Sequence, residues 1–248
     1  MIIVGDIGNT ETKICIINDR LKKIKKFSLN SKKIDIKKLN YYFKNYDFNK
    51  TKKILFCSVV PSTFKSLKKF FLSKTKVKCH ELKELNLNSL IKIDVNFKQV
   101  GSDRLANAIS VSDEKKNFII LDFGTATTFD VMIGKNYKGG IIAPGANLSM
   151  EALHMAAAKL PLVAVRQPAE VVGRNTVQAM QSGIFWGYVG LIEGLVSRIR
   201  SEVGDPELRA IATGGLAPLF NGATDAIYDV DRDLTLRGLL EIYERNAK

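Results

Sequence analysis

The chain has few of the residues that build metal centres or disulfide frameworks. Its 248 residues include only two histidines, His80 and His154, and three cysteines, and none of them has the close, repeated spacing of a zinc site. Cys15 and Cys57 lie in apolar runs typical of strands, which favours buried, reduced thiols. The sequence therefore argues against a disulfide-stabilised secreted protein and predicts a cytoplasmic one without zinc.

Long apolar runs are also missing. No stretch approaches the roughly 20 apolar residues that cross a bilayer as a helix. Residues 1–4 are apolar from the start and lead directly to Asp6, so the N-terminus lacks the basic leader of a signal peptide. Apolar side chains make up 46% of the residues, enough for a large core in a chain of this length. We expect a globular protein with no membrane partner.

Positive charge is abundant but unevenly distributed. The net charge is +13, and residues 1–140 carry 26 lysines and two arginines against 13 acids, whereas residues 141–248 carry two lysines and eight arginines against 12 acids. The lysines alternate with apolar residues, which is typical of the solvated faces of strands and helices. A nucleic-acid-binding stripe is the alternative, but no zinc knuckle or aromatic RNA-binding signature supports it. We expect no nucleic-acid partner.

The composition changes along the chain in a second way. Fifteen alanines follow residue 140 and only three precede it, and lysine gives way to arginine over the same region. We interpret this break as a join, near residues 139–160, between two segments of different codon bias. A poor fit at such a join would leave a chain that folds but works badly. A reading frame of uniform base composition across the region would contradict the hypothesis.

One segment of the sequence occurs twice in altered form. The first copy is Asp6-Ile7-Gly8-Asn9-Thr10-Glu11-Thr12-Lys13, and the second is Asp122-Phe123-Gly124-Thr125-Ala126-Thr127-Thr128-Phe129-Asp130. Each copy lies between two apolar runs, which predicts a strand-turn-strand. Its glycine lets the turn approach a ligand, and backbone N–H groups there can donate to phosphate oxygens. The repeat predicts a nucleotide held between two related half-domains.

Other features add detail to this prediction. In the first copy, Asn9, Thr10 and Lys13 supply donors and positive charge for phosphates, and Asp6 at the strand end could hold magnesium through water. A third close-approach loop is predicted at residues 213–215, which read Thr-Gly-Gly after an apolar run.

The order of apolar patterns predicts an α/β fold. Three short strands are followed by alternating helices and strands, and then by a second set of strands and helices. We expect two half-domains related to ribonuclease H, with mixed sheets flanked by helices and a ligand cleft between them. The first would span residues 1–115 and the second residues 116–248, each containing one copy of the repeat.

These segments together resemble those of a known family. The two acid-glycine-threonine loops and the late glycine pair are similar to the actin, Hsp70 and sugar-kinase fold. More narrowly, the chain resembles the type III pantothenate kinases from end to end. The segments that carry this resemblance are residues 6–13, 101–104, 122–130, 139–145, 160–161, 173–176 and 213–215.

The resemblance implies ATP-dependent phosphorylation of the pantothenate hydroxyl, the first step of coenzyme A synthesis, in a homodimer that uses magnesium and either potassium or ammonium. It assigns the ATP phosphates to residues 6–13, with Asp6, Gly8, Asn9, Thr10 and Lys13, and a further ATP contact to Thr125. It also assigns the monovalent cation to Asp122. Pantothenate binding is assigned to Gly101, Ser102, Asp103 and Arg104, with Asp103 as the proton acceptor. Thr176 is assigned a further pantothenate contact, which can come from the partner subunit.

Elementary chemistry agrees with the role of residues 101–104. An alcohol is a poor nucleophile, and a carboxylate in hydrogen-bond reach can take its proton, as Asp103 would. Arg104 could bind the pantothenate carboxylate with two hydrogen bonds. One position departs from the family pattern, because Asp94 stands where a tyrosine often contacts pantothenate. An acid there would repel a carboxylate substrate if it faced the site.

Two other functions stay open. A sugar or acetate kinase on the same fold would need a different acceptor segment from Gly101-Ser102-Asp103-Arg104. A non-enzymatic relative that assists gene expression would suit the basic first half of the chain, but it would be expected to lack the acids Asp6, Asp103 and Asp122.

Overall fold

The computed structural model describes residues 1–18, 23–157 and 159–245 and divides the chain into two compact units. Unit 1 comprises residues 1–112 and 233–248, and unit 2 comprises residues 113–232. The C-terminal helix therefore belongs to unit 1, and this corrects the expectation that residues 116–248 form one half-domain. Each unit contains one copy of the repeat.

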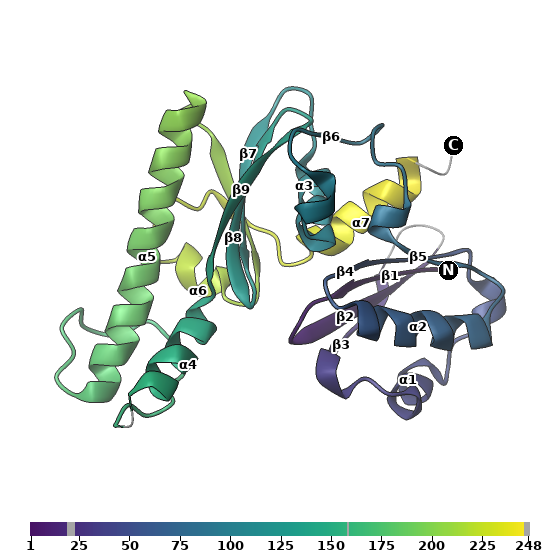
Figure 1. Ribbon diagram of the computed structural model, residues 1–248, viewed down its shortest axis with the longest axis horizontal. Helices are drawn as coiled ribbons and strands as arrows, with labels where there is room; N and C mark the ends of the chain where they lie inside the picture. Colours follow the sequence, from purple (N-terminus) through teal and green to yellow (C-terminus); the bar gives the residue numbers. More distant parts are fainter. Residues whose placement is uncertain (19–22, 158, 246–248) are drawn as a thin grey trace. The chain divides into compact units, whose positions relative to one another are not determined.

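Unit 1 is built on a five-stranded mixed sheet of order β3-β2-β1-β4-β5 (Figure 1). β1 pairs antiparallel with β2 and parallel with β4. The strands are β1 (Ile2–Ile7), β2 (Glu11–Ile17), β3 (Lys23–Asn30), β4 (Lys53–Ser58) and β5 (Cys79–Glu81), and β6 (Lys92–Ile93) follows in the chain. The helices are α1 (Ile36–Phe43), α2 (Pro61–Lys74), α3 (Ser102–Val111) and α7 (Leu234–Arg245), with short 3-10 turns η1 (Ser31–Lys33), η2 (Phe48–Lys50), η3 (Leu82–Glu84) and η4 (Phe97–Gln99).

The central strand of this sheet is apolar on both faces because helices cover both. Ile3 and Ile7 belong to the core that α1 and α2 close with Leu39, Phe43 and aromatic residues of α2. Ile2 and Val4 point to the other face, since side chains alternate along a strand, and α7 and α3 pack there against β1 and β4. Asp6 continues the second series, so the fold places its carboxylate on the α3 and α7 face.

Unit 2 has the same plan. Its strands β7 (Asn117–Phe123), β8 (Ala126–Ile133), β9 (Asn136–Pro144), β10 (Arg209–Gly214) and β11 (Asp229–Val230) are hydrogen bonded in the order β11-β10-β7-β8-β9. β7 pairs antiparallel with β8 and parallel with β10. The helices are α4 (Ala146–Ala156), α5 (Thr176–Val203) and α6 (Ala217–Asn221). Buried side chains of α5, such as Phe185 and Ile192, pack against Ile119, Leu121 and Phe129 of the sheet.

The predicted α/β class with mixed sheets and flanking helices is confirmed. The sequence repeat corresponds to a repeat in topology, because β1 and β7 each have an antiparallel hairpin partner and a parallel partner from later in the unit. Among the described residues, no helix is long and apolar enough to span a membrane.

Candidate active site

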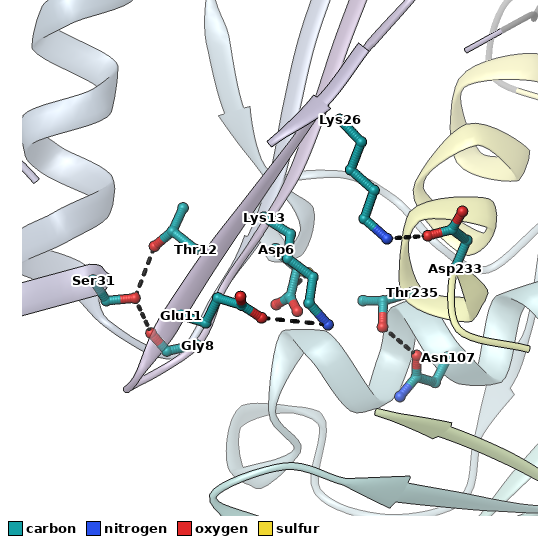
Figure 2. A network of polar contacts seen from close by, with 11 residues as sticks. Asp6, Gly8, Glu11, Thr12, Lys13, Lys26, Ser31, Asn107, Asp233 and Thr235 are labelled. Carbon is teal, nitrogen blue, oxygen red and sulfur yellow. Dashed lines mark hydrogen bonds and ion pairs between the residues drawn. The ribbon is translucent and has the colours of Figure 1, made fainter. Parts of the chain in front are cut away.

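The first glycine turn is held closed from outside the repeat. The Gly8 N–H donates to the Glu11 carbonyl at 3.0 Å, which closes the turn between β1 and β2. The Ser31 hydroxyl donates to the Gly8 carbonyl at 2.6 Å and lies 2.8 Å from the Thr12 hydroxyl (Figure 2). Asn9 and Thr10 are exposed at the tip. The turn is therefore rigid at its base and presents its polar tip to solvent.

Asp6 lies in a row of polar side chains that crosses three strands of unit 1. Its register partners are Lys13 on β2 and Cys57 on β4. Partners in register point to the same face of a sheet. The Cys57 thiol donates to Asp6 Oδ1 with Sγ at 3.4 Å. Lys13 Nζ lies 3.8 Å from the Glu11 carboxylate, and Figure 2 shows this pair beside Asp6. The row combines one carboxylate, one cation and one donor at the end of the central strand.

The segment Gly101–Arg104 forms the start of α3 and is attached to the end of β4. The Ser102 hydroxyl accepts from the Ser58 N–H at 2.7 Å and donates to the Ser58 carbonyl at 3.0 Å. Ser102 is only 2% exposed. Its hydroxyl thus fixes the start of the helix to the sheet, and the substrate contact expected from the sequence stays a prediction.

Asp103 stands in the first turn of α3, next to this attachment. Its Oδ1 accepts from the Arg104 N–H at 2.8 Å, and a Cβ at Gly101 would lie 2.4 Å from the same Oδ1. Burial raises the pKa of Asp103 above its ordinary value, and the Arg104 N–H, the Arg104 charge and Lys83 act in the opposite direction. A carboxylate with a raised pKa is a stronger base than an ordinary aspartate, which suits proton abstraction from an alcohol.

Asp122 is the counterpart of Asp6 in unit 2. It is in register with Thr128 on β8 and with Thr213 on β10, so two hydroxyls flank it where a lysine and a thiol flank Asp6. The Thr128 hydroxyl donates to Asp130 Oδ2 at 3.3 Å. The side chains in register with this carboxylate both end in a hydroxyl oxygen, and oxygen ligands suit a hard cation.

The three glycine loops of unit 2 meet at the end of β7. The Gly124 N–H donates to the Ala126 carbonyl at 3.0 Å, and the Gly145 N–H donates to the Thr125 carbonyl at 3.1 Å. Gly214 has φ +91°, and a Cβ there would lie 2.5 Å from the Phe123 carbonyl oxygen. Only glycine permits this backbone conformation and approach. Thr125 is exposed beside these loops.

Two other residues were singled out in the sequence. Thr176 is the first residue of α5 and is exposed. Asp94 is paired with Lys92, whose Nζ lies 3.6 Å from Oδ1. The positive charge of the lysine lies next to the Asp94 carboxylate and lowers its repulsion of other anions.

Burial is the main reason why the pKa of the Cys57 thiol is raised, and the nearby Asp6 and Asp103 carboxylates raise it further. Within unit 1 the structure therefore brings Asp6, its register partner Lys13 and Asp103 to one region. Sequence reasoning missed three residues that hold this region together, Ser31, Cys57 and Ser58. Their roles depend on neighbours distant in sequence, and no local pattern marks them. Among the described residues no group of three or more histidines, cysteines or acids could bind a metal.

Comparisons with known proteins agree with this arrangement. The family model for type III pantothenate kinase matches residues 2–198. A type III pantothenate kinase from Pelagibacter ubique is 50% identical over 245 residues, which are 97% of each chain. One from Paramagnetospirillum magneticum is 54% identical over 199 residues, 78% of this chain and 75% of that protein.

Solved structures support the fold. A protein from Campylobacter jejuni assigned to the Baf family of transcriptional activators aligns with TM-score 0.63 at 21% identity, covering 99% of this chain and 98% of that one. A protein from Sinorhizobium meliloti assigned as a 2-dehydro-3-deoxygalactonokinase aligns with TM-score 0.61 at 10% identity, covering 100% and 99%. These two show the fold alone, whereas the family match and the 50% identical relative show that the chain belongs to the type III pantothenate kinase family.

Proposed function

We propose that this protein transfers the γ-phosphate of ATP to the hydroxyl of pantothenate, giving 4'-phosphopantothenate in the first step of coenzyme A synthesis. The observation that carries the proposal is Asp103, a carboxylate of raised pKa at the start of α3 in the segment that matches the family's acceptor site. Its fixed position favours proton transfer from one bound alcohol over binding of diverse sugars.

Asp103 and Arg104 divide the work on the acceptor. Asp103 takes the hydroxyl proton as the oxygen attacks phosphorus, and Arg104 binds the pantothenate carboxylate through its guanidinium fork. Gly101 leaves the space beside Asp103 Oδ1 empty, because a side chain there would collide with it. Ser102 keeps the whole segment attached to β4.

The ATP phosphates bind the turn after β1. Its tip offers backbone N–H groups with Asn9 and Thr10, and Lys13 neutralises negative charge. Magnesium usually keeps several waters and is held by one or two carboxylates and the substrate phosphates. Asp6 alone therefore fits as its protein partner, even though the described residues contain no metal-binding cluster. When bound, magnesium neutralises charge on the transferred phosphoryl group.

The loop around Asp122 and Thr125 orients ATP and holds a monovalent cation. A carboxylate flanked by two hydroxyls, those of Thr128 and Thr213, fits potassium or ammonium. We place this activity in the cytoplasm, where the three free buried cysteines stay reduced.

A coupled assay with pantothenate and ATP tests the function directly. We expect product formation that requires magnesium and increases when sodium is replaced by potassium or ammonium, because Asp122 then has its cation. Glucose or acetate as acceptor serves as the control for the related kinases. No phosphopantothenate under any cation would contradict the proposed function, and equal rates in sodium would contradict only the cation site.

We also propose that the protein acts as a homodimer through unit 2. Large apolar side chains on α4, on the segment before α5 and at the start of α5 are exposed: Met155 at 75%, Leu162 at 63%, Val171 at 63%, Val172 at 77% and Val177 at 36%. Such a surface is typical of an interface. Thr176 lies beside it, which agrees with a pantothenate contact supplied by a second copy of the chain.

The glycines of α5 give a test of the dimer. A Cβ at Gly183, Gly187 or Gly190 meets nothing within 4 Å, so a side chain there costs little within one chain. We expect Gly187→Leu to fold normally but to weaken self-association about 10-fold or more, because leucine prevents close helix approach. Sedimentation would measure the change, with Lys69→Leu on exposed α2 as control. An unchanged dimer would place the interface elsewhere.

A further inference from the structure

The interior of unit 1 contains a polar contact that the proposed chemistry does not yet use. Cys57 lies on β4 and is 0% exposed, and its thiol donates to Asp6 Oδ1 with Sγ at 3.4 Å. The Gly5 carbonyl is the other acceptor in reach, at 3.8 Å. Both acceptors belong to β1, the strand that leads into the glycine turn.

We propose that Cys57 is a positioning residue for the Asp6 carboxylate. The inference rests on the proposed function, in which Asp6 faces magnesium and the ATP phosphates. A carboxylate at the end of a strand has two free torsions, and a neighbour that donates to one oxygen selects one orientation. The parallel register of β1 and β4 favours this contact, because it places Asp6 and Cys57 side by side on one face.

The same strand end also positions the second carboxylate of the site. Ser58, the next residue, exchanges two hydrogen bonds between its backbone and the Ser102 hydroxyl, and Asp103 follows Ser102. Two consecutive residues of β4 thus act on the two carboxylates: Cys57 contacts Asp6 directly, and Ser58 holds the start of the helix that carries Asp103. This strand end therefore sets the geometry of the phosphate side and of the acceptor side together.

The chain offers a matched control for this role. Cys79 lies on the neighbouring strand β5 and is also 0% exposed. Within the described part of the chain it makes no hydrogen bond to a carboxylate, and it belongs to the apolar core under α1 and α2. Replacing either cysteine by alanine removes the same atoms from the interior of the same unit. A difference between the two variants in catalysis therefore reports the contact with Asp6.

Three variants and a spectroscopic measurement test the proposal. We expect Cys57→Ala to bind magnesium-ADP about 10-fold more weakly by calorimetry and to lose about 10-fold in kcat, the range seen when a partner of a metal-binding carboxylate is removed. Cys57→Ser retains a donor and should recover most of both losses. Cys79→Ala should leave both unchanged. Equal behaviour of Cys57→Ala and Cys79→Ala, or no recovery in Cys57→Ser, would overturn the proposal.

Raman spectroscopy of the S–H stretch gives a result that does not depend on turnover. The band lost in Cys57→Ser should lie at lower frequency than the Cys79 band, because its thiol donates to a charged acceptor, and it should move toward the Cys79 band in Asp6→Ala. If the frequency of the Cys57 band were the same in Asp6→Ala as in the wild type, the contact would be refuted, even if Cys57→Ala failed to fold. Absence of pantothenate phosphorylation in the wild type would refute the proposed function and leave this measurement intact.

Discussion

Replacing Asp103 with asparagine should lower kcat about 10² to 10⁴-fold while the protein stays folded. Asparagine has nearly the same shape and can accept from the Arg104 N–H as Asp103 does, so the start of α3 should be undisturbed. It cannot take a proton from the pantothenate hydroxyl. Because the role is chemical, we expect the KM for ATP to change much less than kcat, and the acid limb of the kcat profile to disappear with the base.

The coupled assay measures this loss, and Asp35→Asn is the matched control. Asp35 is also an acid at the start of a helix, and it accepts from the Lys38 N–H at the N-terminus of α1, but it has no proposed contact with substrate. Near-normal turnover in Asp103→Asn would remove Asp103 as the base. A higher KM with an unchanged kcat would instead make Asp103 a binding residue.

The same variant should gain stability at neutral pH. Burial raises the pKa of Asp103 in the folded protein, so the ionised carboxylate costs free energy that increases as the pH rises through that pKa. Asparagine carries no such cost. The free energy of unfolding of Asp103→Asn should therefore exceed that of the wild type at pH 7, and the difference should vanish below the ordinary aspartate pKa of about 4. Equal stabilities at pH 7 would contradict the buried-charge argument.

The sequence predicted the parts of the site that depend on short-range patterns. The two copies of the repeat form equivalent hairpins, because a glycine between apolar runs specifies a turn at the same place in each. The position of Asp103 at the start of a helix also follows from the glycine before it and the apolar spacing after it. No local pattern predicts that the Ser102 hydroxyl binds the Ser58 backbone, 44 residues away, because each serine alone is compatible with a hydroxyl that faces solvent.

The unit to which α7 belongs could not be predicted from the sequence for a similar reason. The amphipathic pattern of α7 predicts a helix but not which sheet it covers, and chain order alone assigns it to the half-domain of residues 116–248. In the structure it returns to unit 1 and packs on α3, where the Thr235 hydroxyl donates to Asn107 Oδ1 at 2.8 Å (Figure 2). Just before α7, Asp233 forms an ion pair with Lys26 of β3. The last helix therefore supports the helix that carries Asp103.

The contact between these helices depends on one glycine, and Gly238→Ala should destabilise unit 1 by about 2 to 3 kcal/mol. A Cβ at Gly238 would lie 1.8 Å from the Ala106 carbonyl oxygen, and no side-chain rotation relieves a clash with backbone. The helices must separate, which outweighs the roughly 1 kcal/mol that alanine adds to helix propensity. Ala106 lies one turn after Asp103, so the folded remainder should also turn over more slowly.

Urea denaturation would measure the loss, and Gly222→Ala provides the control because a Cβ at Gly222 meets nothing within 4 Å and its φ of −79° suits any residue. A Gly238→Ala variant as stable as Gly222→Ala would mean that α7 does not pack on α3 as closely as described. A destabilised Gly238→Ala variant whose folded fraction has the wild-type kcat would show that the packing of α7 on α3 stabilises unit 1 without positioning Asp103. In that case the attachment of Ser102 to β4, and not the support from α7, would be what holds Asp103 in place.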